Sequence, residues 1–242
     1  MRRQTLWKAI CAATLALGTT ATNAEFIDDS QVQLKFKNFY LDRQYADLPQ
    51  NNWGSWSQGI TLDAKSGYQD IGAGIQVGAD LLVQHAFKLN GRDKNPDFVL
   101  PHEGPGKGQK DNFGKVGATL KAKVSQTELK VGELLPVSPV LVFDPSRQLL
   151  TTFSGAWLES KDIKDTKLTL AYIDKINNRY DNQFRDLTLF APAKGKKYYD
   201  NGEASDGMWI AGVDHQFNKE IGASYWYANV QDIYQQHYVG LN

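Results

Sequence analysis

Apolar and polar residues alternate along most of the chain beyond residue 30, and the segment 115–125 shows the alternation most clearly. One face of this segment carries Val116, Ala118, Leu120, Ala122 and Val124, and the other carries Lys115, Gly117, Thr119, Lys121, Lys123 and Ser125. Successive side chains of a β-strand point to opposite sides. A strand of a membrane barrel has lipid on one side and water on the other, which produces this pattern. We therefore predict a transmembrane β-strand here.

Segments with the same two-residue period recur along the chain, each about ten residues long and bounded by Gly, Asn, Asp or Pro. They span 31–37, 55–68, 71–89, 115–125, 127–133, 154–163, 167–177, 207–217, 220–230 and 233–241. The links alternate between short ones (66–70, 125–126, 164–165 and 218–219) and long ones (44–54, 90–112, 134–153 and 178–206). Outer-membrane barrels alternate short periplasmic turns with long external loops in this way. The predicted fold class is all-β, a transmembrane antiparallel β-barrel, with about ten strands in this chain.

The first 24 residues have the features of a signal peptide for export. Arg2, Arg3 and Lys8 precede an apolar run, and small residues follow up to Ala24. The apolar run is much shorter than the ~20 residues that a spanning helix needs. We predict cleavage after Ala24, which also removes Cys11, the one cysteine of the chain. Cleavage takes three of the 27 basic residues and none of the 27 acidic ones, so the net charge gives no indication of a nucleic-acid partner.

Motifs for enzymatic chemistry are missing from the sequence. There is no nucleophile elbow, zinc-binding helix or phosphate loop, and the histidines are scattered. We therefore expect neither catalysis nor a cofactor or metal. An alternative to the barrel is a soluble periplasmic β-sandwich that binds a ligand or a partner protein. It would explain the export and the alternation, but not apolar faces on about ten strands without a second core to cover them.

The lysines on the polar faces of the predicted strands are candidate pore-lining residues. They are Lys35 and Lys37 on the first strand, Lys115, Lys121 and Lys123 on the clearest strand, and Lys130 beside Glu128 on the next one. A charge facing lipid near the bilayer midplane would cost ~2–4 kcal/mol, so these residues should face the water-filled lumen. Cations along a narrow pore lower the barrier for anions. The same pattern could also be the solvated face of a soluble sandwich.

Several short motifs occur along the chain in a specific order and spacing. They are Phe26-Ile27-Asp28-Asp29-Ser30, Asn38-Phe39-Tyr40 with Arg43, Trp56-Ser57-Gln58-Gly59, Ser66-Gly67-Tyr68, the stretch 121–133 and the stretch 232–238. In these motifs the chain resembles the OprD family of specific outer-membrane porins. The resemblance implies an eighteen-stranded barrel in the outer-membrane lipid of a Gram-negative bacterium, as a monomer or loose trimer. It also implies a narrow, partly basic channel for small anionic or zwitterionic solutes that carry a carboxylate.

Members of that family are roughly twice as long as the exported part of this chain. The sequence stops at Asn242, after the tenth predicted strand and without the terminal aromatic residue usual in outer-membrane barrels. Ten strands from an eighteen-stranded barrel would leave two unpaired edges, which a bilayer does not tolerate. We expect residues 25–242 to be the N-terminal part of the barrel, in a fragment or frameshifted product rather than a shortened relative.

The long link 134–153 is unusually apolar for a loop in water and contains three prolines. We therefore predict that it buries its side chains. Its position matches the third loop of the family, which folds into the barrel and narrows it. The residues predicted to form this constriction are Pro136, Pro139, Phe143, Asp144 and Ser146.

Arg147 matches an arginine of the same loop in the family, and we predict that its guanidinium binds solute carboxylates through two parallel hydrogen bonds. Alternatively, Arg147 could attach the loop to the wall through Asp144 or Glu133. The chain has Leu149-Leu150-Thr151 where the family usually has Leu-Pro-Gln. The choice of solute is therefore open among basic amino acids, small aromatic acids and dicarboxylates.

Overall fold

The computed structural model describes residues 29–47, 52–91, 96–104, 107–188 and 204–242. The predicted signal peptide, residues 1–24, lies outside these residues. Thirteen strands form one antiparallel sheet. None of the described residues belong to a helix that is long and apolar enough to cross a membrane. A β-sandwich needs two sheets packed face to face, and the described strands form only one.

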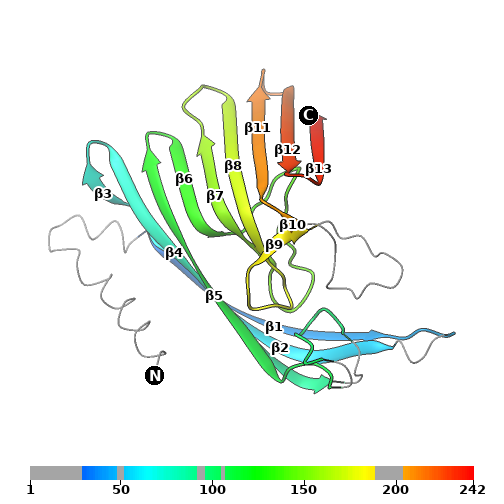
Figure 1. Ribbon diagram of the computed structural model, residues 1–242. Coiled ribbons are helices and arrows are strands. Elements are labelled where there is room, and N and C mark those ends of the chain that lie inside the picture. The colour runs from blue at the N-terminus through cyan, green and yellow to red at the C-terminus, as the bar shows by residue number, and fades with distance from the viewer. Residues whose placement is uncertain (1–28, 48–51, 92–95, 105–106, 189–203) are drawn as a thin grey trace.

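Ten strands follow one another in the sheet in chain order, each paired with the next, as the alternating pattern predicted (Figure 1). These wall strands are β1 (Gln31–Arg43), β2 (Trp53–Lys65), β4 (Ile75–Gly91), β5 (Asn112–Val124), β6 (Thr127–Leu134), β7 (Thr152–Ser160), β8 (Thr166–Asn177), β11 (Met208–Gln216), β12 (Gly222–Val230) and β13 (Tyr234–Leu241). The short strand β3 (Gln69–Gly72) pairs with β4, and β9 (Arg185–Thr188) pairs with both β8 and β10 (Ala204–Ser205).

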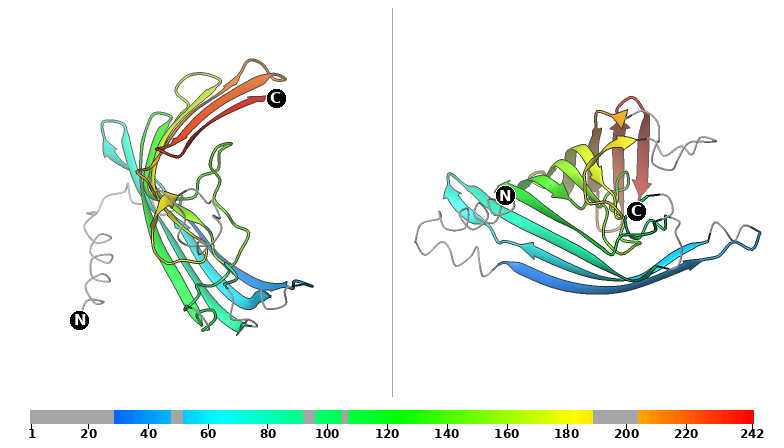
Figure 2. Two further views of the ribbon diagram at one scale, coloured as in Figure 1. Left: turned by 45° about the vertical axis from the view of Figure 1, so that its right-hand side comes forward. Right: turned by 60° about the horizontal axis from the view of Figure 1, so that its bottom comes forward.

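The sheet is strongly curved, and both views in Figure 2 show it as a trough with one concave and one convex face. The segments that follow β6 and β8 lie on the concave side (Figure 2). β1 and β13 are the two edges of the sheet and do not pair with each other within the described residues. The chain therefore forms part of a barrel wall.

Large apolar side chains cover the convex face. Val32, Phe36 and Leu120 are each about two-thirds exposed, and their strand neighbours point to the concave side. In water this much exposed apolar surface would be unfavourable, whereas in a bilayer it is covered by lipid. The alternation in the sequence therefore separates a lipid-facing surface from an inner surface.

One turn differs from the sequence prediction. We predicted a short link at 66–70 followed by a strand over 71–89, but the chain reverses between β3 and β4 at Ala73 and Gly74. Gly72, Ala73 and Gly74 all have positive φ, between 55° and 98°. Two glycines flank Ala73, and glycine adopts this conformation at little cost, so the turn forms there. Ser66–Tyr68 instead forms a short excursion between β2 and β3.

Replacing Leu120 with lysine tests which face of the sheet contacts lipid. Leu120 lies near the middle of β5 on the convex face, where a lysine costs ~2–4 kcal/mol in a bilayer. We expect Leu120→Lys to lower the free energy of unfolding by about this amount, measured by guanidinium titration of protein folded into lipid vesicles. The matched control is Thr61→Lys, on the concave face of β2, which should cost less than about 1 kcal/mol. Equal losses in the two variants would contradict this orientation.

Candidate pore constriction and charged inner wall

The 135–151 segment connects β6 to β7 and packs against two separate apolar clusters. Val140, Leu141 and Phe143 contact a cluster formed by β7, β8, β11 and β12. Its buried members on those strands are Phe153, Trp157, Ala171, Ile173, Met208, Ile210, Trp226, Ala228 and Val230. Leu149 is fully buried in a second cluster with Ala86, Val99, Leu100 and Phe113. The segment is therefore attached by apolar contacts to two distant parts of the inner wall.

The first half of the segment folds back on itself. The Phe143 amide donates to the Pro136 carbonyl at 3.0 Å, and Val137 pairs with Val142 in an isolated bridge. Pro139 is exposed at the tip of this small hairpin, whereas Pro136 is buried. The fold-back buries Val140 and leaves Val137 and Val142 exposed on the concave side of the sheet.

Gln148 attaches the second half of the segment to the wall. Its side chain is 3% exposed, accepts a hydrogen bond from Ser57 Oγ at 2.9 Å, and donates to the Lys37 carbonyl at 3.0 Å. A Cβ atom on Gly59 would lie 1.9 Å from Gln148 Nε2, so only glycine leaves room for this contact. The sequence alone gives no indication of this role of Gln148, because one amide next to a loop arginine forms no recognisable pattern.

Lys37 binds the backbone of the turn that precedes Gln148. Its ammonium donates to the carbonyls of Pro145 (2.9 Å) and Arg147, and it lies 5.4 Å from the centre of the Phe39 ring. No carboxylate of the described residues pairs with Lys37. Its charge therefore remains uncompensated next to the turn.

Among the described residues, the Arg147 guanidinium donates hydrogen bonds only within its own turn. Its Nη1 donates to the Ser146 carbonyl at 3.1 Å and to Ser146 Oγ at 3.4 Å. Its Nε is buried and has no hydrogen-bond partner among the described residues. The two carboxylates that could have held Arg147 have other partners: Glu133 accepts from the Thr152 hydroxyl, and Asp144 pairs with Arg179.

Arg179, just after β8, is a third cation at this turn. It forms an ion pair with Asp144 and donates to Ser146 Oγ at 3.2 Å. Burial lowers the pKa of the Arg179 guanidinium, and the neighbouring Tyr180 opposes this change in the pKa. Arg179 could not be predicted from the sequence, because it is one basic residue in the long link 178–206, where no period indicates the direction of a side chain.

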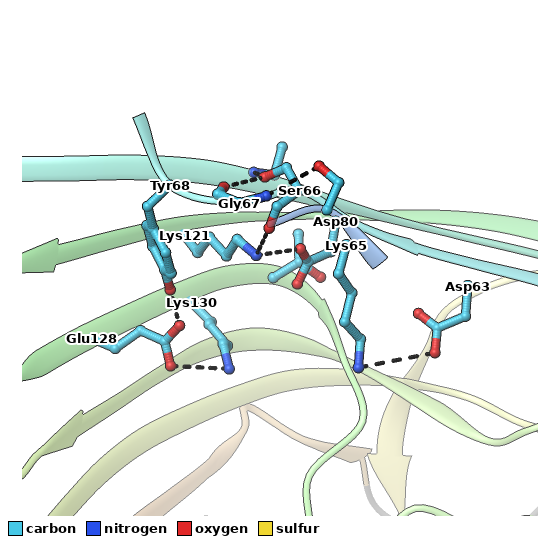
Figure 3. A network of polar contacts seen from close by, with 12 residues as sticks. Asp63, Lys65, Ser66, Gly67, Tyr68, Asp80, Lys121, Glu128 and Lys130 are labelled. Atoms are coloured by element: carbon cyan, nitrogen blue, oxygen red, sulfur yellow. Dashed lines mark hydrogen bonds and ion pairs between the residues drawn. The ribbon is translucent and has the colours of Figure 1, made fainter. Parts of the chain in front are cut away.

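Two of the predicted pore lysines near the short turns, Lys121 and Lys130, are paired with carboxylates. Lys121 contacts Asp80 and the Ser66 carbonyl, both at 2.7 Å, and is almost fully buried (Figure 3). Lys130 pairs with Glu128 at 3.0 Å. These pairs compensate the charges of Lys121 and Lys130, whereas Lys123 has no ion pair among the described residues.

Tyr68 lies across the same part of the wall and donates its hydroxyl hydrogen to Glu128 (Figure 3). The ammonium groups of Lys121 and Lys123 lie 5.0 and 5.8 Å from the centre of its ring, within cation–π range. The Tyr68 side chain therefore reaches from the β2–β3 excursion to β6, on the concave side of β4 and β5.

Two other predicted pore lysines have different environments. Lys35 is exposed, 3.8 Å from Asp63. Lys115 is 5% exposed and donates to the Asn178 carbonyl at 3.0 Å and the Asn177 carbonyl at 3.3 Å. Lys115 thus joins β5 to the end of β8. The structure gathers Lys37, Arg147 and Arg179 around one turn and distributes the other cations along the wall.

The sheet is curved and antiparallel, with an apolar convex face, a charged concave face and a connecting segment on its inner side. These are the features of the wall of an outer-membrane porin. A family model described as "outer membrane porin, OprD family" matches residues 24–242. The chain belongs to the OprD family of outer membrane porins.

Comparisons with individual proteins agree with this membership. The chain is 33% identical over 245 residues to the porin-like protein GalP of Pseudomonas putida, an alignment that covers 98% of this chain and 57% of GalP. It is similar to the crystal structure of a BenF-like porin from Pseudomonas fluorescens Pf-5, with a TM-score of 0.80 and 33% identity, covering 89% of this chain and 54% of that one. The values for Acinetobacter baumannii OccAB2 are a TM-score of 0.79, 38% identity, and 90% and 53% coverage. The chain spans about half the length of these relatives.

Gly59 and Gln148 form a double-mutant cycle that tests how the segment is attached. Gly59→Ala should lower the free energy of unfolding by ~1–3 kcal/mol, because the added methyl group displaces the Gln148 side chain. In a Gln148→Ala background the same change should cost less than about 0.5 kcal/mol, since the clash is gone. Guanidinium titration in lipid vesicles measures both values. Additive losses would show that the two residues do not touch.

Proposed function

We propose that this chain supplies part of the wall and the constriction of a porin that passes small carboxylate-bearing solutes across the outer membrane. OprD-family porins pass small solutes through the outer membrane, and the preference for carboxylates is our proposal. The observation that carries it is the excess of positive charge at the turn 144–147. Three cations, Lys37, Arg147 and Arg179, contact this turn, and Asp144 is the one carboxylate paired there among the described residues.

The excess positive charge lies where it can attract anionic solutes that pass the constriction. The turn belongs to the 135–151 segment, which we propose as the constriction loop because its apolar contacts hold it on the concave side of the sheet. In a narrow pore the low-dielectric wall strengthens the field of fixed charges. An anion near the turn therefore experiences a net attraction, whereas a cation experiences a barrier.

Arg147 is the proposed contact for the solute carboxylate. Its guanidinium has several N–H donors, and the structure pairs it with no carboxylate of the described residues. A planar guanidinium can bind a carboxylate through two parallel hydrogen bonds, which a lysine cannot do. Lys37 is already bound to two backbone carbonyls, so it contributes charge and holds the turn in place.

Ion pairs on the inner wall near the short turns complement this constriction. Lys121 with Asp80 and Lys130 with Glu128 form nearly neutral pairs, so a solute that leaves the constriction does not meet a second strong anion site there. The whole channel, inserted in outer-membrane lipid as a monomer or loose trimer after removal of the 1–24 signal peptide, would then admit anionic or zwitterionic solutes without trapping them.

Arg147→Ala should weaken the block of ion current by a carboxylate. We expect benzoate to reduce the conductance of the whole protein in planar bilayers, and Arg147→Ala to raise the blocking concentration about tenfold or more, as for the loss of one charged hydrogen bond. Benzamide, similar in size but uncharged, should block weakly in both proteins. The matched control is Lys219→Ala, which removes one exposed cation from a short turn outside the channel and should leave the benzoate block unchanged.

Two results would contradict the proposal. An equal benzoate block in the Arg147→Ala variant and the unchanged protein would exclude Arg147 as the carboxylate contact. Equal block by benzoate and benzamide in the unchanged protein would show that the constriction does not select for negative charge.

A further inference from the structure

We infer that Arg179 is a positioning residue that keeps Arg147 available to solutes by occupying the carboxylate of Asp144. This inference rests on the proposed function, because it concerns how the anion-binding arginine is kept unpaired. Asp144 and Arg147 belong to the same turn, whereas Arg179 reaches it from the segment that follows β8.

The contacts place one carboxylate between two guanidinium groups. Asp144 Oδ1 accepts the Ser146 amide at 2.7 Å, and Asp144 Oδ2 pairs with Arg179. Arg147 and Arg179 both donate to the same hydroxyl, Ser146 Oγ, at 3.4 and 3.2 Å. The two arginines therefore lie around one small group, and either could neutralise Asp144.

Burial favours the pair that the structure contains. The Arg179 side chain is 22% exposed and that of Asp144 is 37% exposed, so the pair is partly shielded from water, and its attraction exceeds that of an open surface pair. Because Arg179 pairs with this carboxylate, Asp144 does not compensate the positive charge of Arg147. With Arg147 paired to Asp144 instead, the segment would offer a neutral pair to a passing carboxylate.

The segment that carries Arg179 is held on both sides. Before it, the carbonyls of Asn177 and Asn178 accept hydrogen bonds from the buried Lys115 ammonium. After it, the Tyr180 ring packs edge-on against Phe98, with the ring centres 5.3 Å apart. Arg179 is thus presented to the turn by backbone that is fixed to β5 and to the 96–104 region, which reduces the entropy lost when the ion pair forms.

Loss of Arg179 would change the partner of Asp144. The carboxylate would remain partly buried, and a buried carboxylate without a counter-charge is unfavourable. Arg147 is a cation of the same turn and already shares Ser146 as a contact, so Asp144 would take it as its new partner. The anion site would then be neutralised although Arg147 is still present.

A set of variants tests this in planar bilayers with benzoate as the probe. Arg179→Ala should raise the blocking concentration about tenfold, similar to Arg147→Ala, with the single-channel conductance retained. The double variant Asp144→Ala/Arg179→Ala should return to within about threefold of the unchanged protein, because nothing then competes for Arg147. Arg179→Lys, which keeps a cation for Asp144, should stay within the same range.

Asp144→Asn provides a second test that does not depend on the Arg179 variants folding. It breaks the same ion pair, but it leaves Arg147 without a competing carboxylate, so the benzoate block should be as strong as in the unchanged protein or stronger. If the ion pair only held the loop in shape, Asp144→Asn would weaken the block as much as Arg179→Ala.

The results separate this inference from the proposed function. A double variant as weak as Arg179→Ala would overturn the positioning role. So would an unchanged block in Arg179→Ala when Arg147→Ala does weaken it. An unchanged block in Arg147→Ala would instead refute the proposed function itself.

Discussion

A backbone that crosses lipid must satisfy all of its N–H and C=O groups within the protein, because the bilayer core offers no water to replace them. An antiparallel sheet of consecutive strands does so, since every inner strand is bonded on both sides. The remaining architecture depends on this requirement. Once neighbouring strands are paired along their length, the two-residue period assigns each side chain either to lipid or to the inside.

That assignment places the ion pairs of Lys121 and Lys130 on the concave face, together with the segments that fold against it. The 135–151 segment brings apolar residues to this polar side, and they are buried against the inward-facing Trp157, Ile210 and Trp226. Apolar contacts thus fix the segment, and polar contacts fix its turn: Gln148 binds the β1–β2 wall, Lys37 holds the turn backbone, and Arg179 takes Asp144. The orientation of Arg147 follows from these anchors rather than from its own contacts.

The sequence predicted the ten wall strands well, because alternation such as that of 115–125 is a direct consequence of a surface with lipid on one side. It placed one turn wrongly, since the period of the residues after 71 continued through Gly72–Gly74, and only backbone conformation distinguishes a turn there. The lysine-bearing faces could be listed, but not the partners of the lysines. Pairs such as Lys121 with Asp80 depend on how β4 and β5 are aligned, and Lys115 with Asn178 on contacts across the concave side. Gln148 and Arg179 could not be found, because single polar residues in loops have no period.

The excursion at Ser66–Tyr68 has a consequence for strand alignment during assembly. Lys121 on β5 binds Asp80 on β4 and the Ser66 carbonyl in the link between β2 and β3, so one ammonium connects three segments of the chain. A slip of β5 by one residue would turn every side chain of that strand to the opposite face and move this charge into lipid. The ion pair and the carbonyl contact therefore stabilise the observed register, in which the apolar row of β5 faces outward.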